Sequence, residues 1–192
     1  PNNARQQLTL DDQQPSARAD ARGAALKISV INGDLSFIRQ PLLIGHYRSL
    51  RLSGTEYVVN KLVGGAMENS LKVGLYPVPP GTHQVFVNTH ADPNNPWQPP
   101  RPRAVIVVGL GEEGKLSPTD LVHSVRQATI AWAQQSAETS ADAPALISIA
   151  ATLIGSGGAG ISVGQSAQLV AQGVREADDR LRESNESEAR ER

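Results

Sequence analysis

The sequence predicts an α/β domain in which parallel strands alternate with helices. Three features of its second half lead to this prediction. Residues 105–108 are a continuous β-branched run, typical of a strand buried on both faces. A capped helix begins near Ser117, and a second apolar run at 146–154 precedes a helical pattern over 162–181. Because parallel strands need crossover connections, this order predicts a sheet covered by helices.

The first half of the chain adds further strands and one helix to this prediction. β-type runs at 26–31 and 41–46 and the alternating segment 82–88 predict strands. Helical spacing predicts a helix over 54–62, which the glycine pair that follows would end. Residues 91–103 are rich in proline and predict a long loop, and long loops in compact domains are often functional.

Composition restricts the classes of function open to this chain. Aromatic residues make up 4% of the sequence, which disfavours binding of single-stranded nucleic acid by base stacking. A net charge of −1 gives no overall attraction for phosphate backbones. The absence of cysteine excludes disulfides and thiolate sites and makes a cytoplasmic location the expectation. No apolar run approaches the ~20 residues that span a bilayer, so no membrane partner is expected.

Both ends of the chain are polar and predict linkers. Residues 1–25 lack apolar periodicity, and residues 183–192 are rich in charge. The chain begins with Pro1 rather than Met and ends in the charged run. We therefore expect a domain over residues 26–182 that belongs to a longer polypeptide. The sequence leaves its oligomeric state open.

The strongest candidate for a binding site is the glycine-rich turn between the predicted strand 146–154 and the helix after it. Glycine lets backbone amides face a ligand without a clash from Cβ, and the helix N-terminus adds partial positive charge. This arrangement favours binding of phosphate or another anion. Close packing of the helix on the sheet explains the same glycines equally well. The candidate ligand-binding residues here are Gly155, Ser156, Gly157, Gly158, Ala159 and Gly160.

A second glycine-rich segment, 109–114, connects the predicted strand 105–108 to the helix near Ser117. Ligands of open α/β sheets bind beyond the carboxyl ends of strands, so both glycine loops line one crevice if the two strands are neighbours. Glu112 and Glu113 disfavour a bare phosphate on this loop and indicate contacts to ligand shape or to a sugar. Its candidate ligand-binding residues are Gly109 and Gly111.

The sequence offers no set of residues for catalysis or metal binding. The four histidines, His46 among them, are dispersed without metal-ligand spacing and are expected in loops or at the surface. Ser156 is one residue off the Gly-x-Ser-x-Gly pattern and has no identified base, which disfavours a serine hydrolase. Trp97 is expected to anchor the proline-rich loop. We predict no catalytic residue, no metal and no cofactor.

Several of these segments resemble one family of domains. Residues 105–134 resemble the strand, glycine loop and helix of the N-terminal, non-catalytic domain of leucine aminopeptidases, which has the macrodomain fold. Residues 148–181 are similar to the last strand, phosphate loop and helix of macrodomains, which bind ADP-ribose. The motif Asn-Lys-Leu-Val-Gly-Gly-Ala at 60–66 is similar to a glycine-rich ligand loop there and makes Asn60 a candidate ligand-binding residue. Residues 27–174 also resemble a domain that accompanies caspase-like proteases in bacterial multidomain proteins.

The resemblance implies a three-layer α/β/α, macrodomain-like fold with a mixed sheet. It implies a non-catalytic ligand-sensing or regulatory module, with a neighbouring effector domain and a nucleotide-like or ADP-ribose-like small molecule as partners. The alternatives are an ADP-ribosyl hydrolase of the macrodomain kind and a pure protein-interaction module. Active macrodomains usually present an early acidic residue and a pair of Asn before the first glycine loop. Here Asp34 and Asn60 are the available counterparts, a departure that argues against activity.

Overall fold

The computed structural model of the chain describes residues 26–90, 95, 97–139, 146–157 and 160–190. These residues form a four-stranded mixed sheet with the strand order β2-β3-β1-β4. β1 (Leu42–Tyr47) is parallel to both β3 (Ala104–Gly111) and β4 (Ala150–Ala151), and β2 (His83–Val87) is antiparallel to β3. The predicted linker 1–25 lies outside the described residues.

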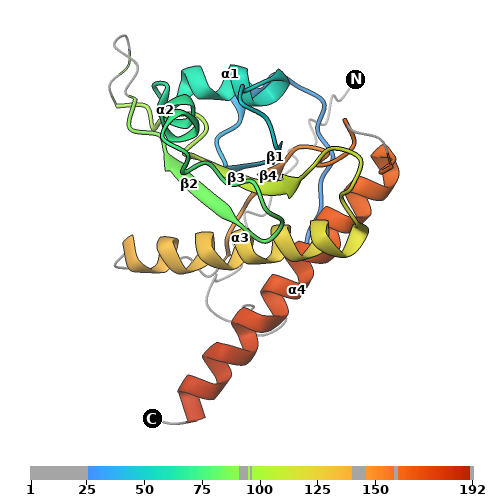
Figure 1. The fold of residues 1–192 in the computed structure, drawn as a ribbon. Coiled ribbons are helices and arrows are strands. Elements are labelled where there is room, and N and C mark those ends of the chain that lie inside the picture. The colour runs from blue at the N-terminus through green and yellow to red at the C-terminus, as the bar shows by residue number, and fades with distance from the viewer. Residues whose placement is uncertain (1–25, 91–94, 96, 140–145, 158–159, 191–192) are drawn as a thin grey trace, which may run out of the picture.

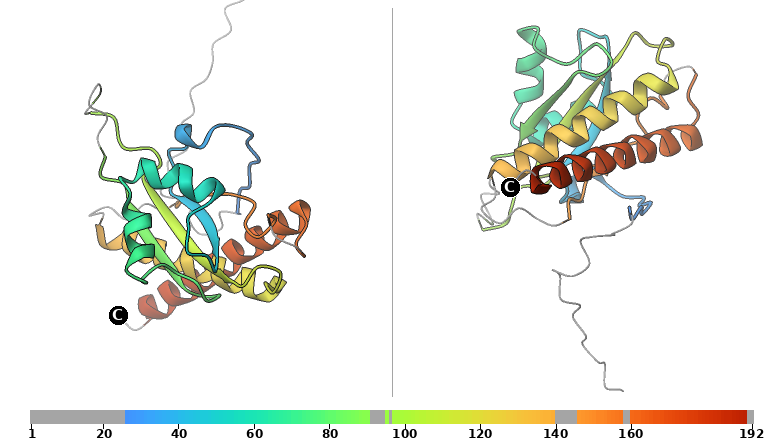
Figure 2. Two further views of the ribbon diagram at one scale, coloured as in Figure 1. Left: turned by 45° about the horizontal axis from the view of Figure 1, so that its top comes forward. Right: turned by 90° about the horizontal axis from the view of Figure 1, so that it is seen from below.

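Helices cover both faces of this sheet and produce three layers (Figure 1). α1 (Gly54–Leu62) and α2 (Ala66–Lys72) pack on one face. α3 (Pro118–Thr139) and α4 (Val163–Arg190) lie side by side on the other face (Figure 2). A single 3-10 turn, η1 (Leu35–Phe37), precedes β1. The predicted three-layer α/β/α arrangement with a mixed sheet is confirmed.

The alternation of side chains along β1 explains why both faces need a helical cover. Leu42 and Ile44 lie in the core beneath α1 and α2, whereas Leu43 between them lies in the core beneath α3. β3 alternates in the same way and is buried along almost its whole length. Strands buried on both faces read as continuous apolar runs, which is why these two were predictable from sequence.

Local sequence signals also fix the start of α3. The Ser117 hydroxyl oxygen accepts a hydrogen bond from the Asp120 amide at 3.1 Å, and the hydroxyl donates to the Asp120 carboxylate at 2.7 Å. This reciprocal cap satisfies an amide that has no partner within the helix. The predicted cap and the predicted helix over 54–62 are both confirmed.

The structure corrects two predicted strands. Residues 26–31 form no strand, and Val30 is 96% exposed, because no described residue pairs with this run. The predicted strand 146–154 pairs with β1 only at Ala150 and Ala151, along the sheet edge. Residues 146–149 extend beyond the start of β1 at Leu42 and so lack hydrogen-bonding partners there. A β-type composition forms a strand only where a neighbouring strand supplies those bonds.

α4 is longer than its sequence pattern predicts and continues through Arg190. Residues 183–187 are exposed, so this end of the helix adds no buried surface to the core. The expected linker over 183–192 is therefore helical through residue 190. Among the described residues, no helix is long and apolar enough to cross a membrane.

Trp97 does not anchor the proline-rich loop as expected. Its side chain is 91% exposed. The loop is held instead by Asn88, whose amide donates to the Arg103 carbonyl at 2.9 Å and whose side chain donates to the Pro102 carbonyl at 3.0 Å. A buried asparagine thus supplies the anchoring that we expected from an aromatic ring.

Candidate functional site

The two glycine-rich segments lie at the same end of the sheet, beyond the carboxyl ends of its parallel strands. β1, β3 and β4 are parallel, so their carboxyl ends point to the same side, and the segments follow β3 and β4 there. The predicted shared crevice required β3 and β4 to be direct neighbours. They are not, because β1 lies between them. Contacts made around the end of β1 decide whether the segments still meet.

Tyr47, the last residue of β1, joins the two segments. Its hydroxyl donates to the Gly155 carbonyl at 3.3 Å. Burial raises the pKa of Tyr47, and the nearby charge of Glu113 raises it further. A Cβ at Gly155 would lie 3.0 Å from a methyl carbon of Leu116. Residues 113–116 and the Gly155 turn therefore converge over the end of β1.

The turn after β4 leaves backbone amides available. Among the described residues, no acceptor pairs with the amides of Gly155 and Gly157. Gly155 adopts a φ of 82°, which favours glycine. No described atom lies within 4 Å of a Cβ built on Gly157, so the space in front of it is open. Gly158 and Ala159 lie outside the described residues.

Hydroxyl groups fix the start of α4 against the end of β4. The Ser166 hydroxyl donates to the Ile154 carbonyl at 2.7 Å in a buried position. The Ser162 hydroxyl accepts from the Gln165 amide at 3.2 Å and caps the helix. The Ser156 hydroxyl donates to the Leu153 carbonyl at 2.7 Å. The turn is thus held at both ends, with the α4 N-terminus facing the same edge as the free amides.

Gly109 and Gly111 belong to β3 rather than to a loop after it. The Gly109 amide donates to the Thr82 carbonyl at 2.9 Å, and the Gly111 amide donates to the Val78 carbonyl at 2.8 Å. A Cβ at Gly109 would lie only 2.3 Å from the Pro79 carbonyl oxygen. Both amides are engaged, so neither is available to donate to a ligand.

Charge on the segment after β3 is partly compensated. Glu112 forms ion pairs with Lys115 and, at 3.5 Å, with Arg48. The hydrogen bond from Lys115 lowers the pKa of Glu112. The Arg48 side chain is 65% exposed and brings a guanidinium to the rim of the candidate site. The repulsion that Glu112 was expected to exert on phosphate is therefore reduced by two cations.

A buried polar cluster corrects the expectation that His46 lies at the surface. His46 is 1% exposed, and its Nδ1 lies 2.8 Å from Oε1 of Glu56, in the first turn of α1. The Tyr76 hydroxyl donates to the same oxygen at 3.0 Å, and the Tyr76 ring meets the His46 ring edge-on at 4.7 Å. Burial and the charge of Glu56 raise the pKa of Tyr76. His46 occupies the face of β1 that Leu42 and Ile44 occupy, and this alternation was the signal for its burial.

This cluster is enclosed, which separates it from a catalytic dyad. Nε2 of His46 is buried and has no partner among the described residues. A general base must reach the proton that it removes, and here no surface leads to that nitrogen. The cluster therefore joins β1, α1 and the segment between α2 and β2 in the core.

Asn60 lies apart from the glycine turns. Its buried side chain accepts a hydrogen bond from the Glu68 backbone amide at 3.1 Å. Its backbone carbonyl accepts one from the Gly65 amide at 2.8 Å. Asn60 therefore ties α1 to the start of α2. No hydrogen bond between described residues joins Asn60 to the turn after β4.

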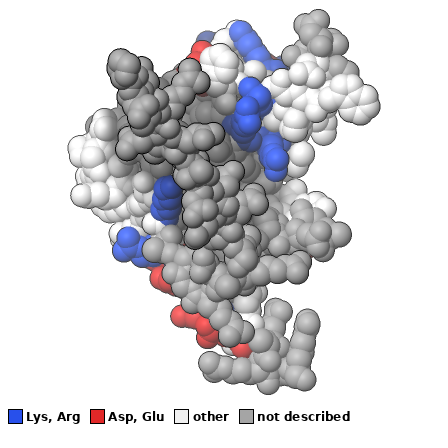
Figure 3. All heavy atoms as spheres, turned by 180° about the vertical axis from the view of Figure 1, so that it is seen from behind, with Lys and Arg blue, Asp and Glu red and all other residues white. Residues whose placement is uncertain are grey.

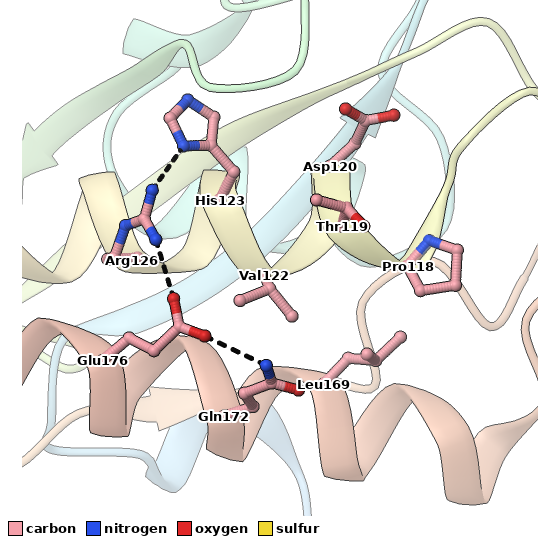
Figure 4. Close-up of a pocket in the computed structure, with 9 residues that line it drawn as sticks. All are labelled: Pro118, Thr119, Asp120, Val122, His123, Arg126, Leu169, Gln172 and Glu176. Atoms are coloured by element: carbon pink, nitrogen blue, oxygen red, sulfur yellow. Dashed lines mark hydrogen bonds and ion pairs between the residues drawn. The ribbon is translucent and has the colours of Figure 1, made fainter.

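A groove of about 410 Å³ lies between α3 and α4, and sequence reasoning missed it. Figure 4 shows Arg126 of α3 pointing to Glu176 of α4, where their ion pair measures 2.7 Å. Arg126 also lies 2.9 Å from Nδ1 of His123, and Gln172 donates to Glu176 at 3.0 Å. Gln172 and Arg126 together lower the pKa of Glu176. These polar groups bind one another, so the groove is a seam between packed helices.

The described residues contain no group of three or more potential metal ligands. The candidate site is therefore built from backbone amides, a helix N-terminus, one exposed guanidinium and a tyrosine wall. Backbone amides, a helix N-terminus and a guanidinium are groups that can bind an anion.

Comparison with known proteins supports the fold. No family model and no curated protein matches the sequence. Among solved structures, the macrodomain of Mycobacterium tuberculosis DarG is similar, with a TM-score of 0.57 over 78% of this chain and 91% of that chain. The two sequences are 14% identical, so the likeness concerns the fold alone. The chain has a macrodomain-like fold.

Proposed function

We propose that this chain is a non-catalytic ligand-sensing module that binds a nucleotide or an ADP-ribose-like anion at the turn between β4 and α4. The observation that carries the proposal is that the backbone amides of Gly155 and Gly157 have no acceptor among the described residues and lie beside the N-terminus of α4. The macrodomain-like fold supports it, because open α/β sheets bind ligands at the carboxyl ends of their strands.

In this proposal each part of the edge has one task. The amides of Gly155 and Gly157 and the α4 N-terminus bind the phosphate oxygens. The guanidinium of Arg48 faces the charge of a second phosphate. Tyr47 and Leu116 form the wall for the less polar part of the ligand. Gly109 and Gly111 set the shape of β3 beneath this wall.

The regulatory part of the proposal rests on α4. This helix has 28 residues, so it is roughly 40 Å long. Its first turn borders the ligand turn, and residues 183–187 extend past the core with exposed side chains. A ligand that orders the first turn would change how firmly the whole helix is held. We propose that α4 connects the site to a neighbouring effector domain, in line with the resemblance to domains that accompany caspase-like proteases.

Calorimetric titration tests this function directly. We expect ADP-ribose and ADP to bind the wild-type domain, and Gly157→Asp to weaken both at least tenfold by placing a carboxylate where the phosphate charge belongs. Gly157 has open space and an ordinary φ, so the substitution leaves the fold intact. Gly33→Asp is the matched control, since Gly33 has the same freedom on a loop before β1.

The outcome separates the proposal from its two alternatives. Equal weakening by Gly157→Asp and Gly33→Asp would contradict a site at this turn. Turnover of ADP-ribosylated protein that falls with Gly157→Asp would replace the sensing module with a hydrolase. Absence of binding to either nucleotide would leave the interaction module in its place.

A further inference from the structure

A second pocket lies at the amino ends of β1 and β3, the opposite end of the sheet from the glycine turns. It has a volume of about 120 Å³ and is lined by Arg39, Pro99, Pro100, Arg101 and Arg103. Arg39 precedes β1, and Arg103 precedes β3 by one residue. The parallel register places Leu42 opposite Val105, so the segments before these strands enter the sheet together. The length of β3, about 25 Å, separates this pocket from the glycine turns at the other end of the strands.

The three arginines of this pocket have no acidic partner among the described residues. The ion pairs of the described chain involve other side chains. With its amide oxygen turned toward Arg101, Gln98 accepts from that guanidinium at 2.8 Å, but a neutral amide compensates no charge. Figure 3 shows several Lys and Arg side chains in the upper part of the back face and others lower on its left side, near Asp and Glu. Like charges that line one small pocket repel one another, and an anion between them offsets this repulsion.

The backbone beside Arg101 and Arg103 is held before any ligand arrives. Asn88 is buried; its side chain donates to the Pro102 carbonyl and its backbone amide donates to the carbonyl of the next residue, Arg103. The prolines of the segment have fixed φ angles, which restricts the chain further. Ordering a loop on binding costs free energy, and a segment already in place avoids most of that cost.

From this convergence we propose a second ligand site, an oxyanion site for one phosphate group held by Arg39, Arg101 and Arg103. Guanidinium groups offer paired N–H donors that match phosphate oxygens, and three cations favour a dianion over a monoanion. The pocket is smaller than the ~300 Å³ at which sites for drug-sized ligands begin, so it takes the phosphate group and leaves the rest of an ester outside. The site is independent of the turn between β4 and α4.

Amide NMR titration with sodium phosphate tests the site on the full 192-residue chain. We expect saturable shifts at the amides of Arg39, Arg101 and Arg103, and much weaker shifts with acetate at the same ionic strength. Arg103→Gln and Arg39→Gln should each weaken phosphate binding at least tenfold. Arg175→Gln is the matched control, because Arg175 is an exposed arginine of α4 outside the pocket. The Arg175→Gln variant should bind phosphate at the pocket with the affinity of the wild type.

The two sources of the phosphate group are separated by a second titration, with phenyl phosphate. Binding at Arg39, Arg101 and Arg103 at least as tight as that of phosphate supports a site for phosphate esters. Binding of phosphate with exclusion of the ester supports a site for the free ion. Non-saturable shifts, equal binding of acetate, or the same loss in Arg175→Gln as in Arg103→Gln would overturn the proposal.

Discussion

Gly109 is the position where a single methyl group should distinguish a packing glycine from a binding glycine. It lies in β3, against the segment that leads into β2. A Cβ there would lie 2.3 Å from the Pro79 carbonyl oxygen, 2.6 Å from the Thr82 hydroxyl oxygen and 2.7 Å from the Val78 carbonyl carbon. Two of these atoms belong to the backbone, which cannot turn aside as the end of a side chain can. Gly109→Ala must therefore displace residues 78–82 from the sheet.

The structure sets the size of the effect. Forcing a methyl group into packed space costs about 1–3 kcal/mol. Displacing the segment also strains the bond from the Gly109 amide to Thr82 and the bond from the Thr82 hydroxyl to Pro79, each worth about 0.5–1.5 kcal/mol. Alanine restricts the unfolded chain and recovers about 0.4–1 kcal/mol. We expect Gly109→Ala to lower the free energy of unfolding by about 2–4 kcal/mol.

Urea unfolding followed by circular dichroism measures this difference, with Gly157→Ala as the control. Gly157 has no described atom within 4 Å of its Cβ position, so its substitution should leave the free energy of unfolding unchanged or raise it by up to about 1 kcal/mol. Equal stability of the Gly109→Ala variant and the wild type would refute the packing argument. A large loss in Gly157→Ala would show that its turn is packed rather than open.

Three further predictions concern the core. Glu56→Ala removes the shared acceptor of two buried groups and should destabilise the domain by about 2–4 kcal/mol, whereas Glu68→Ala, in an exposed ion pair, should cost less than about 0.5 kcal/mol in urea unfolding. Because the pKa of Tyr76 is raised in the folded state, the unfolded chain loses this proton first. Stability should therefore fall above about pH 10 by up to about 1.4 kcal/mol per pH unit, and a wild-type slope matched by Tyr76→Phe would contradict this. Gly173→Ala would place a Cβ 2.8 Å from Val125 and should lower the melting temperature, whereas Gly164→Ala, in open space, should leave it unchanged or higher.

Sequence reasoning succeeded where one local rule decided the structure. The apolar runs of β1 and β3 and the cap at Ser117 needed no knowledge of distant contacts. It failed where the partner was missing. The β-type run 26–31 has no neighbouring strand among the described residues, and Ala150 and Ala151 pair only where β1 extends beside them. Local propensity cannot report whether a hydrogen-bonding partner exists.

The candidate site divides in the same way. The turn at Gly155 could be predicted from the sequence, because a run of glycines between a predicted strand and a predicted helix indicates a tight turn. The sequence could not show that Gly109 is closely packed and Gly157 is open, because Pro79 contacts Gly109 only in the folded protein. The arginine pocket was equally hidden, since Arg39 lies more than 60 positions before Arg101 and meets it through the register of β1 and β3.

An amide NMR titration with ADP-ribose tests the central claim most directly, because it reports both binding and location. The account predicts saturable shifts at Gly155 and Gly157, in the first turn of α4 and at Tyr47 and Arg48, with small changes at Asn60. Shifts confined to the groove between α3 and α4 or to Arg39 and Arg103, or no shift at millimolar ADP-ribose, would contradict a ligand site at this turn.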